Sequence, residues 1–130
     1  MKAKKLNTII QKFNTPEILA INYNLDKLDI KYSVDKTDEY LIRFENPFGF
    51  KCIHERDMMD YWNDKTVTDN WILEIIEGGW LDQEKSRSFI SDEMFQLREF
   101  LIEGIDYCIS VFSLNEPIIK PIEINTRKKK

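Results

Sequence analysis

The chain has 130 residues, of which 42% are apolar and 32% are charged, with 23 acidic against 19 basic side chains. This length suits one globular domain, the apolar content is too high for a disordered chain, and no apolar run reaches the roughly 20 residues that span a bilayer. Cys52 and Cys108 are too few and too far apart for a disulfide framework, which indicates reduced thiols. We therefore expect one cytoplasmic domain over residues 1–130.

The charge is distributed unevenly along the chain. Residues 1–5 and 126–130 contain basic but no acidic side chains, and we expect both to be flexible basic tails. The acidic excess is greatest in residues 55–106, with 14 acids against five bases. Such a surface repels phosphate backbones and attracts basic ones, so we expect a basic protein partner, with no nucleic acid and no membrane. The alternative is that the acidic charge only supports solubility.

The N-terminal third predicts one helix and one hairpin. Apolar side chains recur with helical spacing over residues 6–13, and Pro16 ends that helix. Residues 17–24 fit either a helical turn or a strand. The apolar period then changes to two over residues 28–34 and again over 40–44, on either side of turn-forming residues, which predicts an antiparallel hairpin.

The middle of the chain alternates short elements. Residues 48–52 predict a third short strand, and residues 55–62 a short amphipathic helix. Residues 71–76 are apolar on both faces and predict a central strand, which the glycines at 78–79 end. Residues 80–81 could begin another strand.

The C-terminal third predicts a second hairpin. Residues 82–88 indicate a polar loop, and a brief helix is expected to begin near residue 91. Residues 99–103 and 107–113 flank a turn and predict the hairpin, and an edge strand is expected at 118–119 between two prolines. Together these elements predict an α+β single domain, a mostly antiparallel sheet of about five to seven strands with two or three short helices.

The residues that could carry catalysis are few. Cys52 and His54 would share a face of a strand, but a nucleophilic pair also needs an orienting group, so we expect a core cysteine beside an exposed histidine. His54 with Glu55 and Asp57 is too small a set for zinc, which takes about four ligands at structural sites. We expect no metal and no cofactor.

Paired carboxylates are the other catalytic candidate. Glu74 with Glu77, or Asp82 with Glu84, could serve as the acid and base of a glycosidase. With 23 acids in the chain, such pairs arise by chance. The double glycine lacks the context of a phosphate-binding loop. A hydrolase is therefore the disfavoured alternative, and we expect a protein that is not an enzyme.

Acidic and aromatic residues interleave at two places in the acidic region. Interfaces concentrate binding energy in tryptophan and tyrosine, while flanking charges select the partner. Trp62 and Trp71 have apolar neighbours and are expected in the core, whereas Trp80 suits the core or an interface equally well. The expected partner-binding residues are Asp57, Asp60, Tyr61, Asp64, Glu77, Trp80, Asp82 and Glu84.

Four short runs carry a resemblance to a known class of proteins. They are Phe-Gly-Phe at 48–50, Glu-Arg-Asp-Met-Met-Asp-Tyr-Trp at 55–62, Glu-Gly-Gly-Trp-Leu at 77–81 and Glu-Phe-Leu-Ile at 99–102. Over roughly residues 40–120 the chain resembles small bacterial immunity proteins, in particular those paired with contact-dependent growth-inhibition toxins. The resemblance implies a cytoplasmic, non-catalytic inhibitor that binds a cognate toxin domain, with a basic nuclease as the expected target. The alternative is a small regulatory or scaffold module that binds an endogenous partner.

Overall fold

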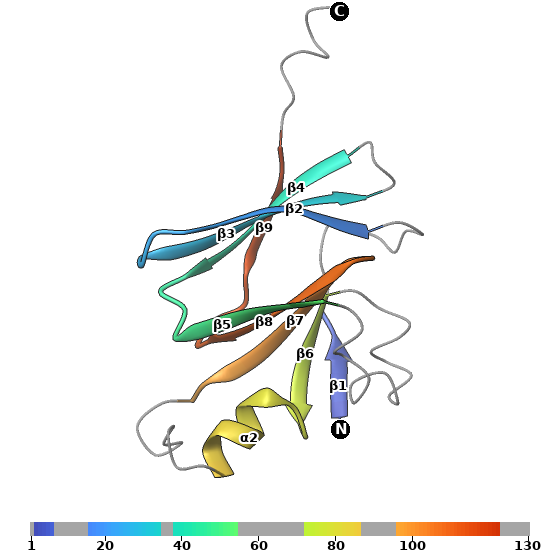
Figure 1. Ribbon diagram of the computed structural model, residues 1–130. Helices are drawn as coiled ribbons and strands as arrows, with labels where there is room; N and C mark the ends of the chain where they lie inside the picture. The colour runs from blue at the N-terminus through green and yellow to red at the C-terminus, as the bar shows by residue number, and fades with distance from the viewer. Residues whose placement is uncertain (1, 7–15, 35–37, 55–71, 87–95, 123–130) are drawn as a thin grey trace, which may run out of the picture.

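The structure is a computed structural model that describes residues 2–6, 16–34, 38–54, 72–86 and 96–122. These residues form two antiparallel sheets packed face to face, with one short helix on the outer side of one sheet (Figure 1). The helix is α2 (Trp80–Ser86). The strands are β1 (Lys2–Lys5), β2 (Pro16–Tyr23), β3 (Lys27–Val34), β4 (Asp38–Glu45), β5 (Gly49–His54), β6 (Ile72–Glu77), β7 (Arg98–Glu103), β8 (Tyr107–Ser113) and β9 (Ile118–Pro121).

The chain passes between the two sheets three times, first between β1 and β2. One sheet has four strands in the order β2-β3-β4-β9, and the other has five in the order β1-β6-β7-β8-β5. After β4 the chain leaves the four-stranded sheet, because Asn46 takes a positive φ of 51° before Pro47, and β5 then pairs with β8. After β8 the chain returns, so that β9 pairs with β4. The result is a β-sandwich.

The core lies between the two sheets. Alternate side chains of β3 and β4 face alternate side chains of β7 and β8, as the period of two requires. The rings of Phe44 and Phe100 meet across the interface with centroids 5.6 Å apart, and the Tyr32 hydroxyl donates to the backbone oxygen of Glu103. The fully buried side chains of this layer include Leu28, Ile30, Tyr32, Ile42, Phe100, Ile102, Ile109 and Val111.

A second apolar layer covers the outer face of the five-stranded sheet. Leu73, Leu101 and Cys108 are buried on this face, and Leu81 of α2 packs with Leu97 and Phe112. Strands β6 and β7 are therefore buried on both sides. This arrangement confirms the prediction of a central strand with two apolar faces.

The α+β prediction is wrong. The described residues form nine strands in two sheets with a single helix of seven residues. Strand periodicity identifies which faces are buried but not which strands pair, so the move of β5 into a second sheet was not predicted. The helices expected over residues 6–13 and 55–62 and near residue 91 lie outside the described residues. Residues 80–86, predicted as a strand start and a loop, form α2 instead.

The other local predictions fare better. Both hairpins are confirmed as β3–β4 and β7–β8, β9 is an edge strand, and residues 17–24 resolve as a strand. Residues 2–5, expected to be a flexible tail, instead form β1 against β6, while residues 126–130 lie outside the described part. No helix in the described ranges combines the length and hydropathy needed to cross a bilayer.

Candidate partner-binding site around helix α2

A glycine pair allows the chain to turn from β6 into α2. Gly78 has a positive φ of 85°, a conformation that L-residues with side chains rarely adopt. At Gly79 an added Cβ would lie 2.7 Å from both Glu99 Oε1 and Ile75 Cγ2. The backbone of the turn is also held by the Asp82 carboxylate, whose Oδ2 accepts from the Gly78 N–H at 2.6 Å. The double glycine therefore positions α2 against the sheet.

The N-terminus of α2 is capped by a residue from another strand. Glu99 of β7 is only 1% exposed. Its Oε1 accepts from the Leu81 N–H at 2.9 Å and its Oε2 from the Trp80 N–H at 3.3 Å. These are two of the N–H groups that a helix leaves unpaired at its start, and the negative charge also suits the positive end of the helix dipole. Glu99 is thus a structural carboxylate.

Trp80 is fixed at the start of α2 by three contacts. Its ring stacks on Phe112 with centroids 3.9 Å apart and an interplanar angle of 28°. The Lys51 ammonium lies 4.6 Å from the centroid of the Trp80 ring, within the range of a cation–π contact. The indole Nε1–H donates to Glu84 Oε2 at 3.1 Å. Trp80 remains half-buried, so part of a rigidly held indole faces solvent.

A cavity of about 150 Å³ lies beside α2. β6 and β7 pair only as far as Ile75 and Glu99, and beyond that point their ends diverge under the helix. The polar residues that line the cavity are Glu74, Glu77, Asp82, Lys85, Arg98 and Glu99. Isoleucine and leucine side chains line the rest, so the cavity is mixed in polarity, and its charged groups include more carboxylates than bases.

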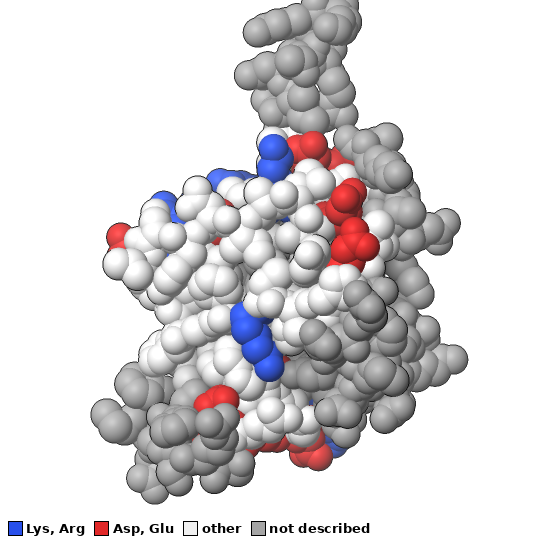
Figure 2. All heavy atoms as spheres, in the orientation of Figure 1, with Lys and Arg blue, Asp and Glu red and all other residues white. Residues whose placement is uncertain are grey.

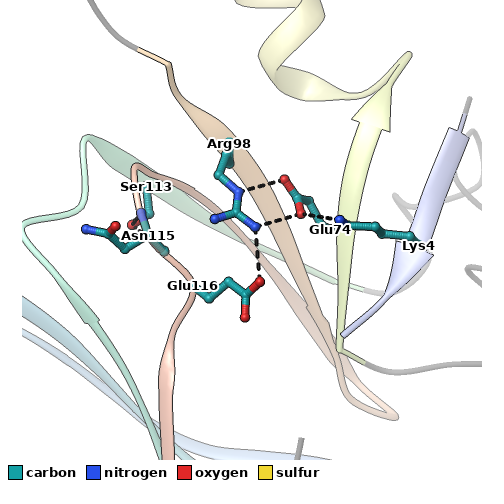
Figure 3. A network of polar contacts seen from close by, with 6 residues as sticks. All are labelled: Lys4, Glu74, Arg98, Ser113, Asn115 and Glu116. Atoms are coloured by element: carbon teal, nitrogen blue, oxygen red, sulfur yellow. Dashed lines mark hydrogen bonds and ion pairs between the residues drawn. The ribbon is translucent and has the colours of Figure 1, made fainter. Parts of the chain in front are cut away.

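An ion-pair network closes one side of this region (Figure 3). Arg98 donates through Nε and Nη2 to both oxygens of Glu74, at 2.8 and 2.9 Å, and through Nη2 to Glu116 at 3.2 Å. Lys4 Nζ lies 3.6 Å from the same carboxylate of Glu74. The hydrogen bonds from Arg98 lower the pKa of Glu74 below its usual value and raise that of Arg98. This network joins β1, β6, β7 and the β8–β9 connection, so it is structural.

The structure brings together half of the expected partner-binding residues. Glu77 is exposed at the end of β6, while Trp80, Asp82 and Glu84 are half-buried on α2. Lys51 and Lys85 lie in the same cluster, so the site is mixed in charge and less acidic than the sequence suggests. Asp57, Asp60, Tyr61 and Asp64 lie outside the described residues.

Three residues of the site were not predicted. They are Glu99, Lys51 and Phe112, which come from three different strands. The period of two within each strand predicts which sheet face a residue lies on, but not which residues of other strands it contacts. The signal that could have found Glu99 is a carboxylate directly beside the apolar run at residues 100–102. Its partner was not predictable, because α2 itself was expected to be a loop.

The catalytic candidates do not assemble into a catalytic arrangement. Arg98 lowers the pKa of Glu74, whereas a general acid needs a raised pKa. Asp82 and Glu84 are two positions apart on a helix, so they do not face each other, and each accepts a hydrogen bond from the chain itself.

The expectation that Cys52 lies in the core is wrong. Cys52, expected in the core, is exposed on the edge strand β5, whereas Cys108 is the buried one. Desolvation raises the pKa of the Cys52 thiol, which disfavours the thiolate that a nucleophile requires. His54 is half-buried, with its ring 5.4 Å from that of Tyr107. Within the described ranges, no group of three His, Cys, Asp or Glu side chains is placed to bind a metal.

Comparisons with protein-family models, with curated protein sequences and with solved structures find no match to this chain. The arrangement around α2 therefore has to be interpreted from its own chemistry: a rigid, partly exposed indole, flanked by carboxylates, on a helix fixed to a β-sandwich.

Proposed function

We propose that the protein is a non-catalytic inhibitor of the immunity type, which acts in the cytoplasm and neutralises a basic toxin enzyme by binding it through the surface around α2. The observation that carries the proposal is the state of Trp80, which is stacked on Phe112, bonded to Glu84 and still partly exposed. An indole fixed before binding loses little side-chain entropy in a complex, and tryptophan is the residue most enriched at binding hot spots.

The carboxylates near Trp80 support a basic partner. Glu77, Asp82 and Glu84 lie close together on one short segment at the surface, and the Asp82 carboxylate accepts from a backbone amide, which leaves its negative charge in place. Charges at the rim of an interface raise the association rate with an oppositely charged partner and make that rate sensitive to salt. A basic nuclease presents such a partner surface, because its cleft normally receives phosphates.

The test is to purify the polypeptide encoded by the toxin gene next to this one and to measure its association rate and Kd at low and high salt. The expected result is a sub-micromolar complex that weakens with salt. The triple variant Glu77→Gln, Asp82→Asn, Glu84→Gln keeps every hydrogen-bond acceptor and should slow association at least tenfold at low salt. Its control is Asp26→Asn, Asp38→Asn, Glu45→Gln, which removes the same charge from exposed positions of the four-stranded sheet.

Trp80→Phe tests the anchor separately. Phenylalanine can still stack on Phe112 but cannot donate to Glu84, so the fold should be kept while binding weakens by roughly tenfold or more. The proposal is wrong if no neighbour-encoded polypeptide binds below micromolar, or if the two charge triples have the same effect. A housekeeping neighbourhood for the gene, together with an endogenous ligand, would instead favour the regulatory or scaffold module.

A further inference from the structure

The second half of the edge strand β2 lacks the protection that the other sheet edges carry. β1, β5, β2 and β9 are the outermost strands of the two described sheets. Natural sheets protect such edges with lysine, proline or bulges, because an edge can pair with another chain. β1 has lysine at three of four positions, β9 contains Lys120 and Pro121, and β5 contains Lys51. In contrast, residues 18–23 of β2 carry no charge.

Within the described ranges, no strand pairs with the backbone of β2 on this edge. The Asn24 N–H bonds to the Lys27 oxygen, and β2 pairs with β3 in one register from Ala20 to Tyr23. Because hydrogen-bonded pairs alternate in an antiparallel ladder, Asn22 bonds to β3, whereas the N–H and C=O of Ile21 and Tyr23 point away from it. Among the described strands, β3 is the only neighbour of β2 in its sheet.

Only the first part of this edge is blocked. A bulge falls between Ile18 and Ala20, and the β7–β8 turn lies against the start of β2, where the Ile105 N–H donates to the Pro16 oxygen at 2.9 Å. Residues 20–23 lie beyond both features. They form a short, uncharged and open edge.

An apolar groove follows the open edge. It has a volume of about 260 Å³ and is lined by residues 18–21 of β2, Cys52 of β5 and Tyr107 of β8, none of them a carboxylate or a lysine. Ile21 and Tyr23 are 36% and 42% exposed. In the view of Figure 2 most of the described surface is uncharged, with basic side-chain atoms near the centre and acidic side chains toward the margins. This surface is apolar, and its outward-pointing backbone groups have no strand beside them in the described part of the chain.

We propose that the occupant of this edge is a second copy of the chain, which pairs antiparallel through β2 across a two-fold axis. Residues 6–126 carry a net charge of −11, so two copies repel each other over most of their surface and can approach where the surface is neutral. A basic partner gains no attraction here. A two-fold interface also requires a patch that complements itself. A neutral strand edge that pairs antiparallel with its own copy meets this requirement. The product is a continuous eight-stranded sheet made of two four-stranded ones.

The free groups define the register. Hydrogen-bonded pairs form when outward-pointing residues oppose each other, so Ile21 of one copy faces Tyr23 of the other, and Asn22 faces Asn22 on the axis. Leu25, which is 77% exposed and has a positive φ of 78°, lies in the β2–β3 turn and is outside the paired segment.

The oligomeric state is measured by sedimentation velocity from low to several hundred micromolar chain. The expected result is a concentration-dependent species of twice the 15.6 kDa chain mass. Asn22→Lys places two like charges opposite each other on the axis and should raise the dimer Kd at least tenfold. Asn22→Gln is its control, and circular dichroism confirms that both variants fold. This test uses no toxin, so it fails or succeeds independently of the proposed function.

A cysteine on the axis tests the register. In a Cys52→Ser background, Asn22→Cys places two thiols across a non-hydrogen-bonded pair, where the Cα atoms lie about 4.5 Å apart, within the range of a disulfide. Mild oxidation should give a covalent dimer, while Lys120→Cys on the opposite edge, β9, should stay monomeric. A chain that remains monomeric at the highest concentration overturns the proposal. So does a dimer that Asn22→Lys does not weaken, or one that links equally well through position 120.

Discussion

Glu99 and Glu103 lie four residues apart on the same face of β7, and they contribute to the fold in opposite ways. Glu99 is 1% exposed and accepts two backbone hydrogen bonds from the start of α2. Glu103 is largely buried, its Oε2 has no hydrogen-bond partner among the described residues, and desolvation raises its pKa to about 8. Whether a buried carboxylate stabilises a sandwich therefore depends on the donors that surround it, because burial alone only penalises its charge.

The largest effect is expected for Glu99→Ala. The substitution leaves the N–H groups of Trp80 and Leu81 without their acceptor and removes a buried side chain, so the free energy of unfolding should fall by about 3 kcal/mol. Urea denaturation measures this loss. Glu77→Ala removes the same charge from an exposed position and should change stability by less than about 0.5 kcal/mol. Equal losses in the two variants would mean that Glu99 does not cap the helix.

Gly79→Ala should come next, at about 2 kcal/mol. The added methyl group would meet Glu99 Oε1 and Ile75 Cγ2 at 2.7 Å, and both neighbours are buried. Gly49→Ala is the control, since its nearest contact would be an ordinary 3.8 Å. The double variant Gly79→Ala, Glu99→Ala should lose less stability than the sum of the two single variants. The reason is that Glu99→Ala removes the Oε1 atom with which the new methyl group at position 79 collides. Strict additivity of the two losses would contradict this.

The sequence predicts the parts of this site that depend on local signals and misses the parts that depend on long-range contacts. The alternation that buries Phe100 and Ile102 locates β7, and the double glycine locates the end of β6, because both signals are local. The helix between them was expected to be a loop, since its cap comes from Glu99, 18 positions further along the chain from Leu81. The two-sheet arrangement was missed for a related reason: whether β5 pairs with β4 or with β8 depends on long-range packing. Trp80, Asp82 and Glu84 lie together on α2 because they are neighbours in sequence.

Glu103→Gln should remove a pH dependence. The Glu103 carboxyl has a pKa of about 8 in the folded protein and about 4.3 in the unfolded chain, so the folded state binds one more proton between these values. The stability from this group is complete below about pH 4 and is lost as the pH rises through about 8. Because the side chain keeps some exposure to solvent, we expect a loss of about 2 kcal/mol, less than the full shift implies.

The measurement compares wild type and Glu103→Gln by urea denaturation at about pH 5 and about pH 9. Relative to wild type, the variant should gain about 2 kcal/mol at the higher pH. Glu77→Gln, at an exposed position, serves as the control for removing a carboxylate. If wild type and Glu103→Gln lose stability in parallel, Glu103 is ionised in the folded protein and the contrast with Glu99 fails.

The smallest effects compare two buried serines of β8. Ser110 is 0% and Ser113 is 1% exposed. The Ser110 hydroxyl has no hydrogen-bond partner among the described residues, whereas Ser113 Oγ donates to the Asn115 oxygen at 2.9 Å and accepts from the Asn115 N–H at 3.2 Å.

Ser110→Ala should therefore leave stability unchanged or raise it by up to about 1 kcal/mol, and Ser113→Ala should lower it by about 1 kcal/mol. Both substitutions remove one oxygen from an equally buried position, so the cavity cost cancels and the sign of the difference reports the hydrogen bonds alone. Equal losses would mean that the Ser110 hydroxyl is satisfied in the folded protein.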